Sequence, residues 1–276
     1  MEAVGASSPL LRIGLIGSGR EAQRHLATVR TVWPQARIAR LVQSTLDLPE
    51  TMLVDWLRAH DVVIIAVPLV ERYRVLELAI REGVHCFVDG LPTPSLKDLE
   101  RLGRLAEEAS VEVGVSRPWR FHPKLQADGA SLGTPSLLHL QQCIGDRGVV
   151  SWHARLAEAI DLCCALARSS SVLQIDGEAV RGRSWIAAVA CNVRFLSGTY
   201  AQVMLWQEAG KSSLELHLGR TGALRRLVLE PAAAASEQAE MLAFLTSLAM
   251  QQPVPVSLTE ALQVLHIVER LMPRLR

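Results

Sequence analysis

The amino-terminal part of the chain alternates between short apolar runs and longer segments with an apolar residue at every third or fourth position. The short runs predict strands, and the longer segments predict helices. The predicted strands are Leu11–Ile16, Ala36–Val42, Asp61–Val67, His85–Val88 and Val111–Val115. The predicted helices are Arg20–Val32, Met52–Ala59, Glu71–Glu82 and Leu96–Ser110. This alternation is typical of an α/β Rossmann domain with a doubly wound sheet, which we expect over residues 1–122.

Beyond Pro123 the pattern changes, because apolar runs now follow one another with few helices between them. The predicted strands are Ser136–Cys143, Val172–Ile175, Ser184–Val193, Thr199–Trp206, Ser213–Leu218 and Leu224–Leu229. The predicted helices are His153–Ala167, Ser236–Met250 and Leu258–Met272. Consecutive strands favour antiparallel pairing, so we expect an α+β domain with an open, mostly antiparallel sheet over residues 123–276.

The open sheet predicts self-association. An exposed sheet face is covered by substrate, by helices or by another subunit. We therefore expect a homodimer or homotetramer that forms through the carboxyl-terminal sheet.

Composition excludes several classes of partner. Of the 276 residues, 49% are hydrophobic, which is enough to build domain cores. The formal net charge is +1, from 29 Lys and Arg against 28 Asp and Glu, so no basic field is available for nucleic acid. Apolar stretches such as Val62–Val70 are much shorter than the roughly 20 residues that cross a bilayer, so we expect no membrane partner.

The first residues include Glu2 and have no basic leading segment, so we expect no signal peptide and a cytoplasmic location.

The cysteines have neither the spacing of a zinc site nor that of a redox motif, and no metal is expected. We predict that all five are buried free thiols: Cys86, Cys143, Cys163, Cys164 and Cys191.

A glycine-rich turn follows the first predicted strand. The segment from Gly17 to Ala22 has the pattern GxGxxA and lies directly before a predicted helix. Gly17 permits a tight turn, Gly19 lets the backbone approach a diphosphate, and Ala22 permits close packing of helix on strand. The turn therefore predicts a dinucleotide site, although such turns also connect strands to helices in proteins that bind no nucleotide.

The end of the second predicted strand bears on the choice of cofactor. An acidic residue there normally binds the adenosine ribose of NAD, but this sequence has Gln43 and Ser44 instead. No arginine comes directly after Ser44 to bind the 2′-phosphate of NADP. We expect NADP or NAD, with NADP slightly favoured. The expected cofactor-binding residues are Gly17, Ser18, Gly19, Arg20, Glu21, Ala22, Gln43, Ser44, Ala66, Val67, Pro68 and Asp89.

Several segments along the chain form a recognisable set. They are the run Asp61–Pro68 with the helix after it, the segment Gly83–Asp89, the crossing Arg120–Pro123, the helix around Ile160-Asp161-Leu162, and the closing pair Glu240–Leu245 and Ser257–Ala261. Together they resemble the glucose-fructose oxidoreductase and inositol dehydrogenase family (Gfo/Idh/MocA). The resemblance spans nearly the whole chain. It implies a Rossmann domain followed by an open sheet, and hydride transfer on a sugar, a cyclitol or a related small molecule.

The sequence departs from this family at residues that handle protons. The family's Glu-Lys-Pro motif is here Asp89-Gly90-Leu91-Pro92, so the lysine is absent. Lys97 cannot easily replace it, because Lys97 lies inside the next helix, for which we expect Ser95 as the cap. The family's histidine three residues before Asp161 is here Glu158. Further departures are Ala154 and Leu156 for an Asp and a Gly, and Leu69 and Arg72 for an Asn and a His.

The remaining candidates for proton handling are Asp89, Glu158, Asp161 and His122. Asp89 follows a strand beside the expected cofactor, but an Asp-Gly pair is also a common turn. Glu158 equally fits a solvated helix face. His122 has a pKa suited to acid–base work, yet a His before Pro at a domain crossing is often structural. The resemblance places Asp161 in the substrate cleft.

Two functions remain open. The first is an NAD(P)-dependent oxidoreductase with altered acid–base groups, for which an imine or an activated double bond is a better substrate than an alcohol. The second is a non-catalytic dinucleotide-binding or partner-binding protein that kept the fold and lost the chemistry. The glycine fingerprint favours the first.

Overall fold

The computed structural model describes residues 10–145, 151–182, 186–210, 212–230 and 234–275. It divides the chain into two compact units. Unit 1 consists of the described residues up to Ser116 and of Glu237–Ala261. Unit 2 consists of the described residues of the other two segments, Arg117–Ser236 and Leu262 onward. Each unit thus contains two stretches of the chain, which differs from a single cut after residue 122.

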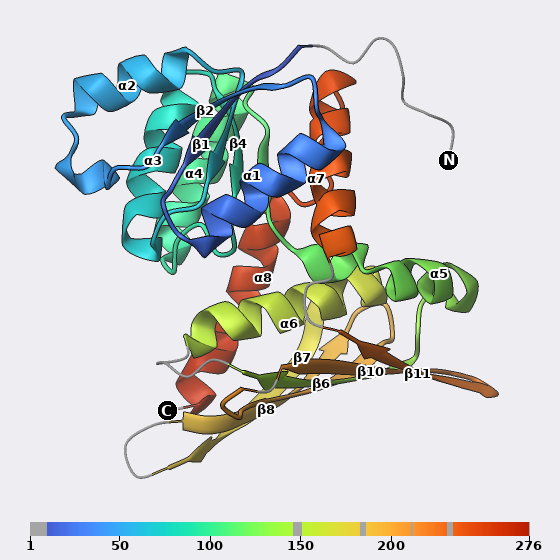
Figure 1. The fold of residues 1–276 in the computed structure, drawn as a ribbon. Coiled ribbons are helices and arrows are strands. Elements are labelled where there is room, and N and C mark those ends of the chain that lie inside the picture. The colour runs from blue at the N-terminus through green and yellow to red at the C-terminus, as the bar shows by residue number, and fades with distance from the viewer. Residues whose placement is uncertain (1–9, 146–150, 183–185, 211, 231–233, 276) are drawn as a thin grey trace. The chain divides into compact units, whose positions relative to one another are not determined.

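Unit 1 is built on a parallel five-stranded sheet with helices on both faces (Figure 1). Its strands are β1 (Arg12–Ile16), β2 (Arg37–Leu41), β3 (Val62–Ile65), β4 (His85–Val88) and β5 (Val113–Val115), in the order β2-β1-β3-β4-β5. The helices are α1 (Arg20–Val32), α2 (Glu50–Arg58), α3 (Leu69–Arg81), α4 (Leu96–Ala109) and most of α7 (Ala234–Ala249), with a short 3-10 helix η1 (Thr45–Asp47). The predicted doubly wound sheet is confirmed.

Strand β3 is apolar at every position because it lies in the centre of the core of unit 1. All four of its residues are at most 1% exposed, because helices cover the sheet on both sides. Helix α7 completes this core: Phe244 lies against Phe87 with ring centroids 5.0 Å apart, and Gly114 in β5 leaves room for the Phe244 ring. A segment close to the carboxyl terminus is therefore part of the first unit's core.

Unit 2 is built on a six-stranded, mostly antiparallel sheet. Its strands are β6 (Leu137–Ile144), β7 (Val172–Arg181), β8 (Ile186–Phe195), β9 (Tyr200–Gln207), β10 (Ser213–Arg220) and β11 (Ala223–Leu229), in the order β11-β10-β6-β9-β8-β7. Only the pair of β6 and β9 is parallel among these strands. The predicted sheet is confirmed, although residues 184 and 185 of the expected third strand lie outside the described residues.

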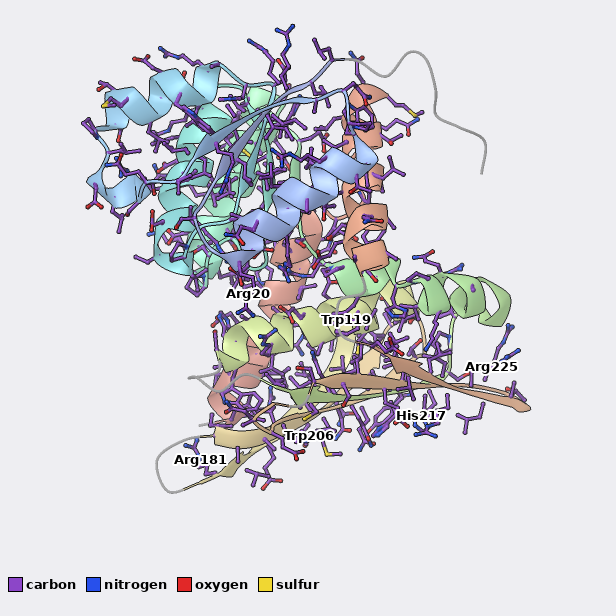
Figure 2. The ribbon with its side chains drawn as sticks, viewed as in Figure 1. Arg20, Trp119, Arg181, Trp206, His217 and Arg225 are labelled. Atoms are coloured by element: carbon purple, nitrogen blue, oxygen red, sulfur yellow. The ribbon has the colours of Figure 1, made fainter. Side chains whose placement is uncertain are left out.

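The helices of unit 2 are α5 (Pro123–Leu132), α6 (Trp152–Ala167) and most of α8 (Leu258–Leu271), with 3-10 helices η2 (Pro118–Phe121) and η3 (Met272–Leu275). Helices α5 and α6 lie on one face of the sheet (Figure 1). The sequence did not predict α5, whose first position is Pro123. Trp206 and His217 project from the sheet face opposite to α6 (Figure 2).

All five cysteines are buried free thiols, as predicted. Burial raises the pKa of Cys191 to about 12, so its thiol stays protonated at neutral pH. Within the described part of the chain, none of the helices combines the length and apolar character that a membrane span requires.

Candidate functional site

The glycine-rich turn between β1 and α1 is as tight as its sequence predicts. Gly17 has a φ of +138°, and a Cβ at this position would collide with the carbonyl oxygen of Ala66. The Gly17 amide donates a hydrogen bond to the Leu41 carbonyl at 2.9 Å. Ala22 is fully buried beneath the turn. Only glycine at position 17 lets α1 begin this close to the end of β3.

The first turn of α1 contains backbone amides that no helical carbonyl accepts from. Gly19 is the N-cap residue and has no side chain to accept a hydrogen bond. The helical hydrogen bonds begin with the Gln23 amide, which donates to the Gly19 carbonyl at 3.2 Å. The amides before Gln23 therefore have no helical acceptor, and the helix dipole favours an anion in front of them. Arg20, at the start of α1, is exposed (Figure 2).

A cavity of about 240 Å³ lies beside this turn, at the carboxyl ends of the parallel strands. Its lining consists of Ser18, Gly19, Glu21, Ala66, Val67, Pro68, Arg72 and Asp89. All of these except Arg72 belong to the predicted cofactor-binding set. Residues that follow β1, β3 and β4 are thus brought together, as expected for the ends of neighbouring parallel strands.

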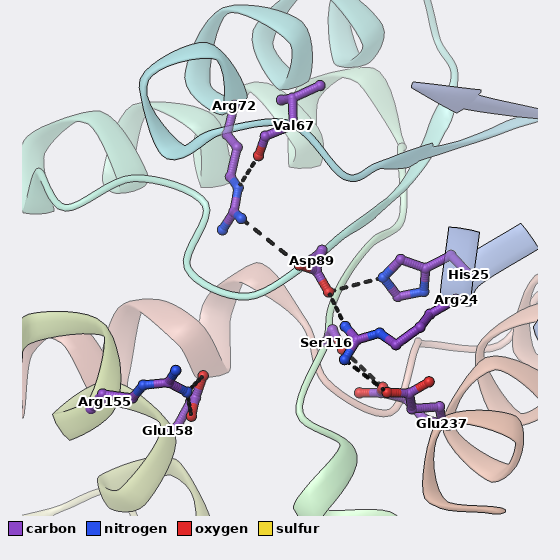
Figure 3. Close-up of polar contacts among 10 residues, drawn as sticks. Arg24, His25, Val67, Arg72, Asp89, Ser116, Arg155, Glu158 and Glu237 are labelled. Atoms are coloured by element: carbon purple, nitrogen blue, oxygen red, sulfur yellow. Dashed lines mark hydrogen bonds and ion pairs between the residues drawn. The ribbon is translucent and has the colours of Figure 1, made fainter. Parts of the chain in front are cut away.

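Asp89 lies among three basic side chains (Figure 3). Its carboxylate oxygen Oδ1 is 2.9 Å from His25 Nε2 and 3.8 Å from Arg24 Nη2, and Oδ2 is 3.8 Å from Arg72 Nη2. Burial opposes ionisation of Asp89, but the hydrogen bond to His25 and the nearby positive charges outweigh it and lower the pKa of the carboxyl. Asp89 is therefore a carboxylate at neutral pH.

Arg72 joins two loops that line the cavity. Its Nε donates to the Val67 carbonyl at 2.9 Å, and its Nη1 donates to the Leu91 carbonyl at 3.0 Å. The first carbonyl belongs to the loop after β3, and the second to the loop after β4. The guanidinium thus spans both loops and also faces Asp89 (Figure 3).

The two residues expected at the adenosine ribose lie after β2 and are exposed. Ser44 Oγ accepts a hydrogen bond from the Leu46 amide at 3.4 Å and donates to Glu71 Oε2 at 3.5 Å. The Glu71 carboxylate is buried and also accepts a bond from the Thr45 amide at 2.8 Å. Gln43 and Ser44 do not line the 240 Å³ cavity, and their role at the ribose stays a prediction.

In unit 2, Asp161 is almost fully buried, at 1% exposure. Both of its oxygens accept hydrogen bonds from Arg120, from Nε and from Nη2, each at 2.7 Å. Arg117 Nε lies 3.7 Å from the same carboxylate. A bidentate pair of this kind fixes orientation. The contacts favour a structural role, and a catalytic role for Asp161 stays a prediction.

Arg120 also lines a cavity of about 430 Å³ between α5 and α6, whose other lining residues include Arg168, Leu162 and Leu218. This volume is within the range of small-molecule sites. Glu158, on α6, is partly exposed and pairs with Arg155 one helical turn away at 3.1 Å (Figure 3). Its catalytic role is likewise untested.

His122 is buried and caps α5. Its Nδ1 accepts a hydrogen bond from the Lys124 amide at 3.3 Å. Burial lowers the pKa of His122, and the Lys124 charge lowers it further, so the ring is neutral near pH 7. The capping bond favours the structural alternative, and the catalytic role stays a prediction.

Sequence analysis missed three members of the cluster around Asp89: Arg24, His25 and Arg72. A signal for His25 existed, because His25 lies three residues after Ala22 on the buried face of α1. A polar residue in an apolar helical stripe has a buried partner, since an unpaired buried polar group is costly. No comparable local signal marks Arg72, whose partners all come from other segments.

Neither a protein-family model nor a curated protein matches the sequence. Solved structures match the whole chain. UDP-N-acetylglucosamine 3-dehydrogenase GnnA from Acidithiobacillus ferrooxidans is 17% identical, with a TM-score of 0.81 over 97% of this chain and 98% of its own. Scyllo-inositol dehydrogenase from Lactobacillus casei, solved with NAD(H) and scyllo-inositol, is 13% identical, with a TM-score of 0.80 over 97% of each chain.

Biliverdin reductase from Synechocystis sp. PCC 6803, solved with biliverdin and NADP+, is 14% identical, with a TM-score of 0.72 over 96% of this chain and 99% of its own. These structural neighbours are dehydrogenases and a reductase with a Rossmann domain and an open sheet. The chain shares this two-domain fold, which the resemblance in sequence had implied.

Proposed function

We propose that the chain is an NAD(P)-dependent oxidoreductase, a divergent member of the Gfo/Idh/MocA family, which transfers a hydride to or from a small molecule. The observation that carries this proposal is the cavity at the first turn of α1. It combines backbone amides without helical acceptors, a turn that only glycine permits, and residues from the ends of three parallel strands.

The residues around the cavity fit a dinucleotide. The amides of Gly19 to Ala22 would hold the diphosphate, and Gln43 and Ser44 would face the adenosine ribose. The loop from Ala66 to Pro68 and Asp89 would border the nicotinamide. A nicotinamide dinucleotide, when bound, supplies or accepts the hydride. NADP is slightly favoured over NAD because Gln43 and Ser44 replace the usual acidic residue.

Proton handling must differ from that of the family. Asp89 is ionised and can accept a proton but not donate one at neutral pH. The segment Asp89-Gly90-Leu91-Pro92 lacks the lysine that the resemblance implies, and Glu158 is found where the resemblance implies a histidine. A substrate whose proton comes from water or from the substrate itself fits this set. An imine or an activated double bond meets that requirement better than an alcohol.

The alternative is a non-catalytic dinucleotide-binding or partner-binding protein. It is supported by the contacts of the candidate groups: Asp89 faces three basic side chains, Asp161 is paired with Arg120, and His122 caps a helix. Turnover of the nucleotide separates the two functions, because only the oxidoreductase oxidises or reduces a substrate.

The proposal extends to assembly and location. We propose a cytoplasmic homodimer or homotetramer formed through the carboxyl-terminal sheet. Large apolar side chains on the sheet face away from α6 support this, since a soluble monomer rarely exposes such a row.

The test of function is titration of the purified chain with NADPH and NADH, followed by nucleotide fluorescence, and then a screen for oxidation of NADPH with carbonyl, imine and enone acceptors. Saturable binding with turnover supports the oxidoreductase. Tight binding without turnover on any acceptor favours the alternative. If neither nucleotide binds, the proposal is wrong.

Gly19→Leu tests the location of the site. A Cβ at Gly19 would meet only the Glu21 carboxylate, and the backbone there has an ordinary φ of −75°, so the fold tolerates a side chain. We expect NADPH to bind at least about tenfold more weakly, a loss of ~1.4 kcal/mol, while the melting temperature stays close to that of the wild type. Gly103→Leu, at an uncrowded helical glycine outside the cavity, is the control. Equal affinities in the two variants would place the nucleotide elsewhere.

A further inference from the structure

Gly90 has a conformation and a neighbour that together disfavour a side chain. Its φ is +73°, in the left-handed region that favours glycine. A Cβ built at Gly90 would lie 3.2 Å from Nη1 of Arg72. The space beside the backbone, just after β4, is therefore occupied by a guanidinium that comes from α3.

The guanidinium of Arg72 is held by groups from both loops. The Val67 carbonyl belongs to the loop after β3, while the Leu91 carbonyl and Asp89 belong to the loop after β4. The Arg72 side chain is only 16% exposed, yet it lines the cavity. Two carbonyl bonds and one facing carboxylate make it a fixed part of the cavity wall.

We infer that Arg72 and Gly90 form a clamp that positions the loops after β3 and β4 around the nicotinamide end of the cavity. Arg72 is the positioning residue, and Gly90 makes room for it. This inference rests on the proposed dinucleotide site. The lysine of the motif that the resemblance implies is absent from Asp89-Gly90-Leu91-Pro92, and the positive charge beside Asp89 comes instead from Arg72 on α3.

An arginine serves this purpose for a geometric reason. Its planar fork donates to two carbonyls on different loops at once, which the single ammonium group of a lysine does poorly. The guanidinium also stays protonated at every physiological pH, so it supplies a fixed charge beside Asp89 and no proton. The clamp therefore supplies a cation at the cavity without a proton donor.

The experiment compares Arg72→Met, Arg72→Lys, Gly90→Ala and the double variant Arg72→Met/Gly90→Ala with the wild type. Gly83→Ala is the matched control, because Gly83 has nearly the same φ, +71°, but nothing within 4 Å of its added Cβ. Two quantities are measured: the Kd for NADPH by fluorescence, and the pKa of the Asp89 carboxyl by carbon NMR. The other titratable or charged groups facing that carboxyl, His25 and Arg24, are unchanged in all variants, as is the Glu237 that pairs with Arg24.

We expect Arg72→Met to weaken NADPH binding about tenfold, which is ~1.4 kcal/mol, and to raise the pKa of Asp89. Arg72→Lys should bring the pKa of Asp89 close to the wild-type value, but it should leave NADPH binding weaker than in the wild type. Gly90→Ala should change both quantities in the direction of Arg72→Met, whereas Gly83→Ala should change neither. The double variant should bind no more weakly than Arg72→Met alone, because both changes remove the same contact.

Three results would overturn the clamp: a Gly90→Ala variant that binds NADPH like Gly83→Ala, an Arg72→Met variant unchanged in both quantities, or full restoration of affinity by lysine. If the wild type binds neither NADPH nor NADH, the proposed function fails separately. The pKa of the Asp89 carboxyl in Arg72→Met and Gly90→Ala then tests the clamp on its own. A raised pKa in both variants supports the clamp, and an unchanged pKa refutes it.

Discussion

Asp89 is a carboxylate that keeps its charge despite burial. Burial alone would raise the pKa of the carboxyl, but the hydrogen bond to His25 and the charges of Arg72 and Arg24 lower it. The folded state therefore binds this proton less tightly than the unfolded state, whose Asp pKa is about 3.9. The charge stabilises the fold above that unfolded pKa, and its contribution is lost as the pH falls through the folded pKa.

This linkage makes a prediction for Asp89→Asn. The variant should be less stable than the wild type at pH 7, because three basic side chains lose their anionic partner. The difference should shrink as the pH falls below about 4, because the unfolded wild-type chain then takes up a proton at Asp89, and it should vanish once the pH is below the lower folded pKa. Urea unfolding from pH 7 to pH 3 measures it. Asp55→Asn, at a side chain 78% exposed, should show little difference at any pH. A difference for Asp89→Asn that is constant with pH would contradict the assignment.

Helix α7 is the element whose position depends most on contacts between residues far apart in the chain. Met241, Phe244 and Leu245 are each at most 1% exposed and belong to the core of unit 1. Ser116 Oγ, after β5, donates a hydrogen bond to Glu240 Oε2 at 2.9 Å, and the Val115 amide donates to the Val256 carbonyl at 2.9 Å. The carboxyl-terminal segment thus covers β5 by apolar and polar contacts.

Gly114→Ala tests this packing. A Cβ at Gly114 would lie 2.7 Å from a ring carbon of Phe244, so the ring or the strand must shift. We expect a loss of about 1–3 kcal/mol in the free energy of unfolding, as in other overpacked cores. Gly103→Ala, in α4 with nothing near its added Cβ, should instead gain about 0.5–1 kcal/mol. Urea denaturation measures both. An equal gain in the two variants would show that α7 does not press on β5.

At the scale of the whole molecule, the exposed sheet face is the main surface left to explain. The pairing registers place the same face outward along all six strands. The large apolar side chains on it, each at least 38% exposed, are Leu137, Val180, Tyr200, Met204, Leu224 and Val228. Polar residues such as Glu215 and Arg226 share this face, and we propose that subunits associate over the exposed apolar positions.

Met204→Lys tests the association. Met204 lies on β9, between β6 and β8 and therefore near the middle of the sheet. A buried, unpaired ammonium at a subunit interface should weaken association by about tenfold or more. Leu196→Lys, at an apolar and more exposed residue in the turn after β8, is the control and should have little effect. Light scattering at micromolar concentrations measures the mass. A wild-type monomer would refute the proposed dimer or tetramer.

The candidate site was predictable as far as its residues follow the ends of strands. Ser18, Gly19, Val67 and Asp89, which line one cavity, could be grouped in advance because each follows a strand in sequence and parallel strands end at one edge of the sheet. Arg72 and His25 were not found, because their partners come from other segments. Sequence periodicity indicates which face of a helix is buried, but it does not identify the side chains that this face contacts.

The sequence by itself determined the order and type of most elements, the glycine turn before α1 and the change from a parallel to an antiparallel sheet. Each of these depends on residues within about one element's length, where turn geometry and periodicity act. The tertiary structure alone decided which core α7 joins, which cation lies beside Gly90 and which partners hold Asp89 and Asp161. Those contacts join segments far apart in the chain, and packing selects them only when the strands and helices are assembled.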